Sequence, residues 1–390
     1  MPLSAPHAEP HPPYLWVEQT KDLPQVIEAL ENETVIGVDL ECDSMFHYHE
    51  RVCLIQIATR RQNFVVDPIR VEDISPLAPI FSNPDTEKVF HGADYDMRSL
   101  YRDFRIEVHS LFDTQIAARF LGVKETGLGN LLAERFSVIA DKKYQKKDWS
   151  QRPLPEAMIQ YAVQDIHYLL PLSDMLKQEL EEKGLMSCVV EENELLSRVR
   201  PESGDNRPFF LHFKGAARLD PRSLAVLEAL LRFRDQEARR RDCPHFKVLG
   251  NKPILEMVQL KPVTKAQLHT IDGLSPKLIR HIGPRVIQSI KDGLGLPKAA
   301  LPVYPRGPRQ RPSAKVAARV KTLKAWRDHM GERLDVDPAL ICTNAQIQAI
   351  AGRNPQTPGE LASTEGIKKW QIERFGADIC ATLKGVHHPK

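Results

Sequence analysis

The chain has 390 residues, of which 42% are hydrophobic and 27% charged, with a formal net charge of +3 and six cysteines. This length predicts two or three domains of roughly 100 to 200 residues each, in a globular protein that folds without disulfides. The cysteines never stand as C-x-x-C, which argues against a disulfide scaffold or a cysteine-based zinc site. No apolar run approaches the roughly 18 residues of a membrane span, and no signal-peptide pattern is found. We therefore expect a cytoplasmic protein without a membrane partner.

The charges divide unevenly along the chain. Residues 1–200 hold 21 Lys and Arg against 33 Asp and Glu, whereas residues 201–390 hold 33 basic and 18 acidic residues. This asymmetry indicates that the basic half binds a polyanion and that the acidic half has a different role. Two differently solvated surfaces without a partner are the alternative.

The first 200 residues have the pattern of a sheet with helices packed around it. Short β-branched or apolar runs bounded by polar residues predict strands, and longer stretches have the apolar spacing of helices. A strand set followed by helices predicts an α/β sandwich. The predicted strands are 34–41, 52–58, 64–67 and 88–91, and the predicted helices include 128–136 and 155–183.

Two carboxylates end the first of these strands. Because side chains alternate along a strand, Asp39 and Glu41 project from the same face, about 7 Å apart along the chain. This pair provides half of a site for a divalent ion. In isolation a solvated strand end is the better interpretation, since D-x-E is a common chance pattern.

Two more aspartates lie where the fourth strand gives way to a helix. Either Asp94 or Asp96 has the side chain to cap that helix. We assign Asp96 to the chemistry because Tyr95 precedes it and because Met97 and Leu100 follow at core-facing helical spacing. We assign Asp94 to the cap, although it would also be able to compete for a metal ion.

The long helix carries a phenol and a carboxylate one turn apart. Tyr161 and Asp165 stand at i and i+4, so their side chains lie on one helix face. A buried tyrosine hydrogen-bonded to its own helix is an equally good interpretation of this pair alone.

Together these residues predict a metal-dependent active site. Four acids on three separate elements can hold two Mg²⁺ or Mn²⁺ ions, which prefer carboxylate oxygens and water. Two such ions about 4 Å apart stabilise the attacking and leaving oxygens of a displacement at phosphorus. The phenol of Tyr161 can orient or deprotonate the attacking water. The predicted catalytic set is Asp39, Glu41, Asp96, Tyr161 and Asp165.

Basic and aromatic residues are candidates for RNA contacts. A lysine cluster followed by Trp149 is suited to holding an RNA backbone near an acidic site, and a solvated loop is the equally weighted alternative. The loop after the first carboxylate pair offers aromatic and histidine side chains to a terminal nucleotide, although an ordinary polar loop is the simpler interpretation. The candidates are Lys142, Lys143, Lys146 and Lys147 in the cluster, and Phe46, His47, Tyr48 and His49 in the loop.

Two proline-rich and glycine-rich stretches, 198–222 and 294–313, are predicted to be linkers. They leave three predicted domains, at 1–200, 216–296 and 314–386. Arg239, Arg240 and Arg241 in the second domain are candidates for phosphate contacts that position RNA without reading its sequence.

The second and third domains repeat one another. A shift of 93 positions places Arg234 and Asp235 on Arg327 and Asp328, and Gly273 on Gly366, with matching apolar positions between them. The apolar spacing within each copy is helical, so each copy is predicted to be a bundle of about five short helices. We assign the duplicated Arg-Asp pairs to structure.

The ordered motifs resemble those of a known family. Asp39-Leu40-Glu41, Tyr95-Asp96 and Tyr161 to Asp165 resemble the three motifs of the tyrosine branch of the DEDD 3′-to-5′ exonucleases. The stretches 112–120 and 148–154 are similar to that family between its motifs. The repeats resemble the helicase-and-RNase-D C-terminal (HRDC) module, so that nearly the whole chain resembles the ribonuclease D family.

The resemblance implies a ribonuclease H-like catalytic domain followed by two all-helical domains. It also implies hydrolytic release of 5′-mononucleotides from RNA 3′ ends, with precursors of transfer RNA as the usual substrates. Asp39, Glu41, Asp96 and Asp165 carry over as metal ligands, and Tyr161 carries over as the residue that positions the nucleophilic water. We expect the active form to be a monomer.

The sequence alone leaves two other functions open. A DNA exonuclease of the same superfamily would use the same carboxylates, because neither they nor the basic repeats distinguish a 2′-hydroxyl. A catalytically silent RNA-binding scaffold is less well supported, since all four acids and the tyrosine are present.

Overall fold

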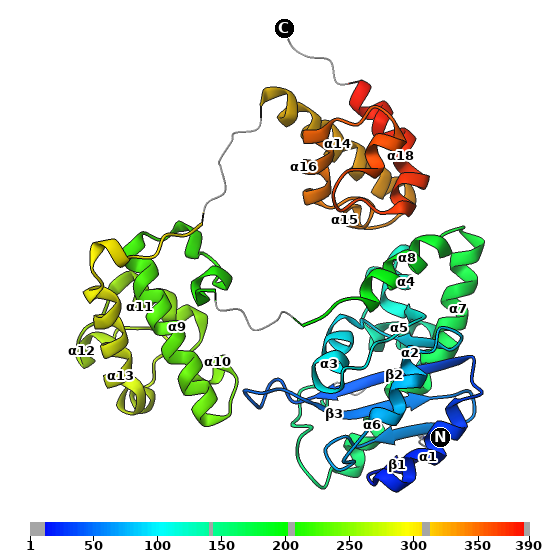
Figure 1. Ribbon diagram of the computed structural model, residues 1–390, viewed down its shortest axis with the longest axis horizontal. Helices are drawn as coiled ribbons and strands as arrows, with labels where there is room; N and C mark the ends of the chain where they lie inside the picture. The colour runs from blue at the N-terminus through cyan, green and yellow to red at the C-terminus, as the bar shows by residue number, and fades with distance from the viewer. Residues whose placement is uncertain (1–11, 140–142, 202–206, 306–312, 386–390) are drawn as a thin grey trace, which may run out of the picture. The chain divides into compact units, whose positions relative to one another are not determined.

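The computed structural model describes residues 12–139, 143–201, 207–305 and 313–385 (Figure 1). These residues form two compact units. The larger unit contains residues 12–42, 52–201 and 313–385, and the smaller unit contains residues 43–51 and 207–305. None of the helices described combines the length and the apolar character needed to cross a bilayer.

The core of the larger unit is a mixed six-stranded sheet with the strand order β1-β4-β3-β2-β5-β6. β3 pairs antiparallel with β2 and β4, and the other pairs are parallel. The α/β fold predicted for this region is therefore confirmed. The strands are β1 (Tyr14–Val17), β2 (Val35–Cys42), β3 (Val52–Ala58), β4 (Asn63–Val66), β5 (Glu87–Phe90) and β6 (Leu111–Asp113).

The sequence patterns predict β2 to β5 to within one residue but miss the two edge strands. β1 has four residues and β6 has three. Neither is long enough to show the repeated alternation on which a strand prediction depends.

The helices of the N-terminal half surround this sheet. The segment 155–183, which the sequence predicts to be one helix, is two helices that meet at Tyr168. Pro171 in the first turn of α7 has no N–H group to continue the hydrogen-bond ladder of α6. The helices are α1 (Leu23–Leu30), α2 (Ala78–Ser82), α3 (Asp94–Phe104), α4 (Thr114–Phe120), α5 (Leu128–Phe136), α6 (Glu156–His167), α7 (Leu169–Glu182) and α8 (Met186–Ser197).

The two faces of β2 contact different helices. Ile36, Val38 and Leu40 pack into a core with residues of α1, α2 and α3. The alternate positions face α6 and α7, because a Cβ added to Gly37 would lie 3.3 Å from the Cβ of Leu169. Asp39 shares the face of Gly37. The absent side chain of Gly37 therefore lets the α6–α7 junction approach the strand that carries the first carboxylates.

The C-terminal half forms two helical modules, as the repeat predicts. Each module has five helices, and every helix of the second begins 93 positions after its counterpart in the first. The first module has α9 (Pro221–Arg241), α10 (His245–Val248), α11 (Asn251–Leu260), α12 (Lys265–Leu268) and α13 (Pro276–Gly295). The second has α14 (Ala314–Leu334), α15 (Pro338–Ile341), α16 (Asn344–Arg353), α17 (Pro358–Ala362) and α18 (Lys369–Lys384).

The duplicated arginines have the structural role assigned to them. Nη1 of Arg234 donates to Oδ1 of Asn251 at 2.7 Å, and Nη1 of Arg327 donates to Oδ1 of Asn344 at 3.1 Å. Both bonds tie the first helix of a module to its third. Part of the predicted first linker belongs to the first module, since Phe210 and Phe213 are buried in its core.

Candidate metal centre

Three carboxylates from two elements converge in the larger unit. Oxygen atoms of Asp39, Glu41 and Asp165 all lie within 4.8 Å of one another. Asp39 and Glu41 come from β2, on the face that α6 covers, and Asp165 comes from α6. The predicted grouping of the first and third motifs is therefore present in the fold.

Asp96 lies beside this cluster, in the first turn of α3. Its side chain is buried, with 8% of the residue exposed. Burial raises the pKa of Asp96 well above its usual value, and the neighbouring charge of Asp39 raises it further. Asp96 is thus close enough to Asp39 for their charges to interact, although it does not belong to the tight group of three.

A buried aspartate fixes the start of α3 and α4. The carboxylate of Asp113 accepts hydrogen bonds from the backbone N–H groups of Gly92, Ala93, Gln115 and Ile116, at 2.7 to 3.1 Å. It therefore caps α4 and also holds the turn that leads into α3. The sequence reasoning missed this role, because nothing local links Asp113 to a helix twenty residues earlier.

The prediction that Asp94 caps α3 is wrong. The residue before the helix is Ala93, which makes no side-chain cap. Asp94 points outward with a 60% exposed side chain, and it accepts from Nε of Arg98 at 2.8 Å and from Nη2 at 3.1 Å. This pairing lowers the pKa of Asp94. Because Asp94 is itself the first residue of α3 and not the residue before it, its carboxylate is not in the capping position; it pairs with Arg98 and lies outside the cluster.

The electrostatics of the cluster favour a bound cation. Burial raises the pKa of Asp39 to about 6 and that of Asp165 to about 7, and burial with the charge of Asp39 raises the pKa of Glu41. Within the described ranges, no Lys or Arg side chain forms an ion pair with these carboxylates or with Asp96. Clustered oxygen donors without a basic partner fit the ligand preference of Mg²⁺ or Mn²⁺.

Tyr161 lies against the cluster. Its phenol lies on the same helix face as Asp165, as the i, i+4 spacing predicts, and the two side chains interact. Burial raises the pKa of Tyr161, and the charges of Asp165 and Glu41 raise it further. The Tyr161 ring packs near Tyr144 and Trp149, with ring centroids at 5.9 and 6.1 Å.

A buried ion pair positions the segment that carries Trp149. Arg152 donates from Nε and Nη2 to the carboxylate of Asp67 at 2.6 and 2.7 Å, and from Nη2 to the carbonyl of Cys53 at 2.8 Å. Asp67 is fully buried. Arg152 therefore anchors the chain before α6 to the sheet. Its partner lies 85 residues away, so no local pattern in the sequence indicates this pair.

A cavity of about 360 Å³ adjoins the carboxylates. Its lining includes the three clustered acids, Tyr161 and several neutral polar side chains, among them Gln145 and His91. Nδ1 of His91 lies 2.9 Å from Oγ1 of Thr114, which agrees with a structural role for this histidine. The cavity is polar and large enough for part of a nucleotide.

The predicted lysine cluster runs beside this cavity. Lys143, Lys146 and Lys147 are exposed, and Nζ of Lys143 lies 4.6 Å from the ring centroid of Tyr144. Lys142 lies outside the described residues. The three described lysines are therefore exposed at the surface next to the cavity.

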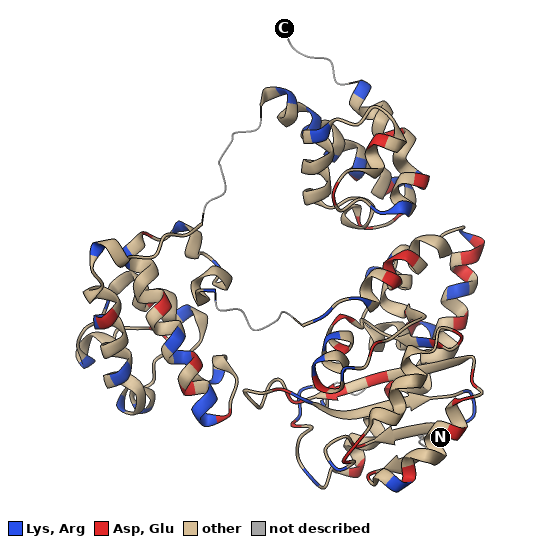
Figure 2. Cartoon of the chain, viewed as in Figure 1, with Lys and Arg blue, Asp and Glu red and all other residues tan. Residues whose placement is uncertain are grey.

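The predicted arginines of α9 are partly engaged within the smaller unit. Figure 2 shows basic residues concentrated toward the end of α9. Arg240 and Arg241 pair with Glu237, whose buried carboxylate also binds Arg285 of α13. Arg239 stays largely exposed and donates to the hydroxyl of Tyr48.

The loop 43–51 also packs within the smaller unit. The hydroxyl of Tyr48 donates to Asp235 at 2.7 Å, and Nδ1 of His47 lies 2.6 Å from Asp242. Nζ of Lys247 lies 4.3 Å from the ring centroid of Phe46. The aromatic and histidine side chains of this loop therefore have protein partners on the first helical module.

Comparison with known families agrees with this site. The sequence profile of a family described as 3′-5′ exonuclease matches residues 14–181, and that of the HRDC domain matches twice, at 223–290 and 316–383. The two HRDC matches are 93 positions apart, which is the period of the repeat. The fold and the site thus define a 3′-to-5′ exonuclease with two HRDC modules.

Similar proteins show which family of 3′-to-5′ exonucleases the chain resembles. The chain is 30% identical to a ribonuclease D of Gluconacetobacter diazotrophicus, over 95% of this chain and 92% of that protein. It is 27% identical to a ribonuclease D of Pseudomonas paraeruginosa, over 96% and 98%. The crystal structure of Escherichia coli RNase D superposes with a TM-score of 0.73 at 26% identity, covering 96% of this chain and all of that one. The chain therefore belongs to the ribonuclease D family and is a 3′-to-5′ exoribonuclease.

Removing Arg152 should destabilise the larger unit. We expect Arg152→Ala to lower the free energy of unfolding by about 3 to 5 kcal/mol, because it leaves the buried carboxylate of Asp67 unpaired. Arg60→Ala is the matched control: Arg60 pairs with Asp174 at the surface, and its loss should cost at most about 1 kcal/mol. Urea unfolding measures both variants. Equal midpoints for the two would contradict the anchoring role of Arg152.

Without metal, the stability of the larger unit should fall as pH rises. The raised pKa values of Asp39 and Asp165 mean that the folded state holds extra protons between about pH 4 and pH 7. Their contribution therefore favours folding at low pH and is lost as pH rises through the folded pKa values. In EDTA, the melting temperature should decrease from pH 5 to pH 8, and Asp165→Asn should flatten this decrease.

Added metal should reverse this loss of stability at the upper end of the pH range. At about a hundred times its Kd, added Mn²⁺ should raise stability by roughly 2.7 kcal/mol. Asp94→Asn serves as the control, because Asp94 lies outside the cluster and its pKa is lowered. A melting profile that Asp165→Asn leaves unchanged would show that the cluster does not govern the pH dependence.

Proposed function

We propose that this exoribonuclease uses two divalent ions to release 5′-mononucleotides from RNA 3′ ends, with precursors of transfer RNA as its substrates. One observation carries the proposal: carboxylates from separate elements converge without a basic partner in the described residues, and the phenol of Tyr161 lies beside one of them. The similar E. coli RNase D is an exoribonuclease involved in structured RNA processing, which supports the same substrate class.

We assign the metal-binding role to Asp39, Glu41, Asp96 and Asp165. When bound, Mg²⁺ or Mn²⁺ would neutralise the scissile phosphate and stabilise the charge that develops on its oxygens. The carboxylates supply only oxygen donors, which suits hard cations. Their separate origins on β2, α3 and α6 make the site dependent on the packing of these elements.

Tyr161 has a positioning role in this proposal. Its raised pKa keeps the phenol protonated at neutral pH. It therefore orients the attacking water by hydrogen bonding and does not remove a proton from it. Tyr144 and Trp149 restrict the ring, and Asp165 lies one helical turn away on the same face.

The proposed division of labour follows the three predicted domains. Residues 1–200 carry the chemistry, and the modules at 216–296 and 314–386 help to capture RNA. The RNA backbone would contact the lysine cluster near the active site, at Lys142, Lys143, Lys146 and Lys147. On the first module it would contact Arg239, Arg240 and Arg241 of α9. We also propose that the protein is cytoplasmic and acts as a monomer.

Trimming of a labelled RNA tests the chemistry. With 5′-labelled single-stranded RNA and Mg²⁺ or Mn²⁺, we expect a ladder that shortens one nucleotide at a time from the 3′ end. Asp39→Asn and Asp165→Asn should each slow it by at least about a hundredfold, because charge stabilisation at the reacting phosphate is lost. Tyr161→Phe should slow it by about a hundredfold through loss of water positioning.

Asp94→Asn should trim at the rate of the unchanged protein, and EDTA should abolish trimming in all variants. A DNA of the same sequence should be trimmed slowly. Equal trimming of DNA would favour the general exonuclease, and binding without trimming would favour the scaffold.

The lysine cluster can be tested through salt dependence. Replacing Lys143, Lys146 and Lys147 with Ala should weaken RNA binding and reduce the slope of log K against log salt by about 2, at roughly 0.7 per contact. Exposed Lys21 and Arg61, which lie outside both modules and do not line the cavity, provide a control double variant with little expected change. An unchanged slope in the triple variant would assign the cluster to a solvated loop.

A further inference from the structure

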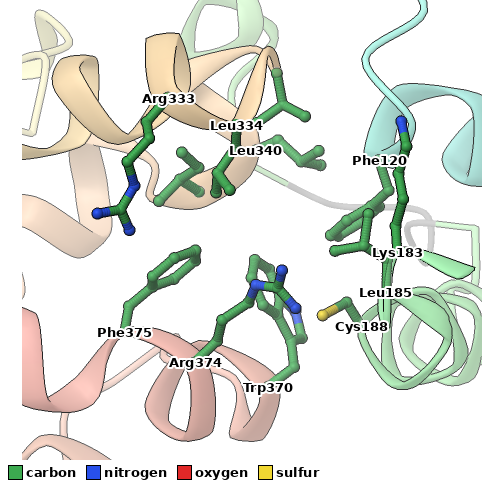
Figure 3. Close-up of a pocket in the computed structure, with 12 residues that line it drawn as sticks. Phe120, Lys183, Leu185, Cys188, Arg333, Leu334, Leu340, Trp370, Arg374 and Phe375 are labelled. Carbon is green, nitrogen blue, oxygen red and sulfur yellow. The ribbon is translucent and has the colours of Figure 1, made fainter. Parts of the chain in front are cut away.

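A second cavity lies in the larger unit, where the second helical module meets the helices that follow the catalytic region. Its volume is about 300 Å³. Residues of α4, α8 and the α7–α8 turn form one wall, and residues of α14, α15 and α18 form the other (Figure 3). None of the five proposed catalytic residues lines it, so it is separate from the metal centre.

Specific hydrogen bonds hold the two walls together. The carboxylate of Glu192 accepts from Nζ of Lys368 at 2.5 Å and from Nε1 of Trp370 at 2.9 Å. Glu191 accepts from the backbone N–H groups of Lys369 and Trp370, each at 2.7 Å. These bonds fix the two walls relative to each other, so the cavity is preformed within this unit, as ligand pockets usually are.

The surface inside the cavity is apolar and mostly aliphatic. Leu185, Leu334 and Leu340 are partly exposed there, whereas the neighbouring rings of Trp370 and Phe375 are each only 3% exposed. Buried rings offer no free face on which a nucleobase would stack. An apolar side chain fits this surface better than a nucleotide does.

Three cations surround the apolar surface. Lys183, Arg333 and Arg374 line the cavity, no acidic residue does, and none of the three pairs with a carboxylate in the described part of the chain. Figure 3 shows Lys183 and Arg333 at opposite ends of the cavity, with Arg374 between them. A ligand with several acidic groups spaced along it would complement three separate cations.

The module fold does not require this apolar surface. Leu334 and Leu340 correspond, 93 positions earlier, to Arg241 and Lys247 in the first module. The same positions are therefore basic in one copy and aliphatic in the other. Partly exposed aliphatic side chains inside a cationic rim are typical of a site where a partner inserts an anchor residue.

We propose that this cavity binds an acidic segment of a partner protein. One bulky aliphatic side chain of the segment enters the cavity, and carboxylates on either side of it pair with Lys183, Arg333 and Arg374. The exoribonuclease thus has a docking site for an acidic peptide, apart from its RNA-binding surface.

A defined peptide tests the proposal. The probe is a fluorescein-labelled heptapeptide, Glu-Asp-Asp-Leu-Asp-Glu-Glu, titrated against the full chain by fluorescence anisotropy up to about 1 mM protein. We expect saturable binding that weakens at least about fivefold with Arg333→Glu, which turns attraction into repulsion, and with Leu340→Lys, which installs the first-module residue. Arg353→Glu, an exposed site on α16 outside the cavity, should bind like the unchanged protein.

Peptide variants separate the apolar contribution from the ionic one. Replacing the central Leu with Ser, or the acidic residues with Lys, should abolish binding. The melting temperature of Arg333→Glu should be unchanged, which shows that the variant is folded and keeps this test independent of the proposed catalytic mechanism. Absence of binding, equal binding of the Ser peptide, or insensitivity to Arg333→Glu would each overturn the proposal. The proposal would also be overturned if octanoate or single-stranded RNA displaced the peptide equally well from the unchanged protein and from every variant.

Discussion

Repulsion among clustered carboxylates is the constraint around which the catalytic region is arranged. Asp39, Glu41 and Asp165 converge, and Asp96 lies beside them, where burial and mutual charge make ionisation costly. Such a cluster persists only if surrounding contacts hold its elements in place. Gly37 permits the close approach of α6 to β2, Asp113 holds the turn into α3, and Arg152 with Asp67 anchors the chain that leads into α6. None of these residues belongs to the cluster, but each holds in place an element that carries one of its carboxylates.

The same constraint explains how charge is distributed over the molecule. A region with a net excess of acidic residues would repel RNA unless cations intervened, and the structure provides for two kinds. The oxygen cluster suits divalent ions, and exposed lysines follow the edge of the cavity next to Tyr161. In the first helical module, by contrast, several arginines are bound to the buried carboxylate of Glu237. Basic residues in this chain thus serve both as ligands for a polyanion and as internal supports.

The sequence predicts the parts of the site that depend on local periodicity. Alternation along β2 places Asp39 and Glu41 on one face of the sheet. The i, i+4 spacing places Tyr161 and Asp165 on one helix face, and the 93-residue repeat predicts two similar modules. It does not predict contacts between distant segments, such as Arg152 with Asp67. The assignment of Asp94 to a helix cap failed because α3 begins one residue earlier than expected, and the turn before it is held by Asp113 from β6. The edge strands β1 and β6 were missed because they are too short to show a period.

The contacts that join the second module to α8 also mean that the two copies of the repeat have diverged in role. Lys368 and Trp370, which bind Glu192, correspond to Ser275 and Lys277 in the first copy. Neither of those residues can reproduce the same pair of bonds. The internal framework, with Arg234 and Arg327 in equivalent bonds, has been retained while the outer surfaces have changed. A chain in which the copies exchanged places would therefore keep both folds but lose the attachment at α8, so the order of the modules is itself a structural property of the protein.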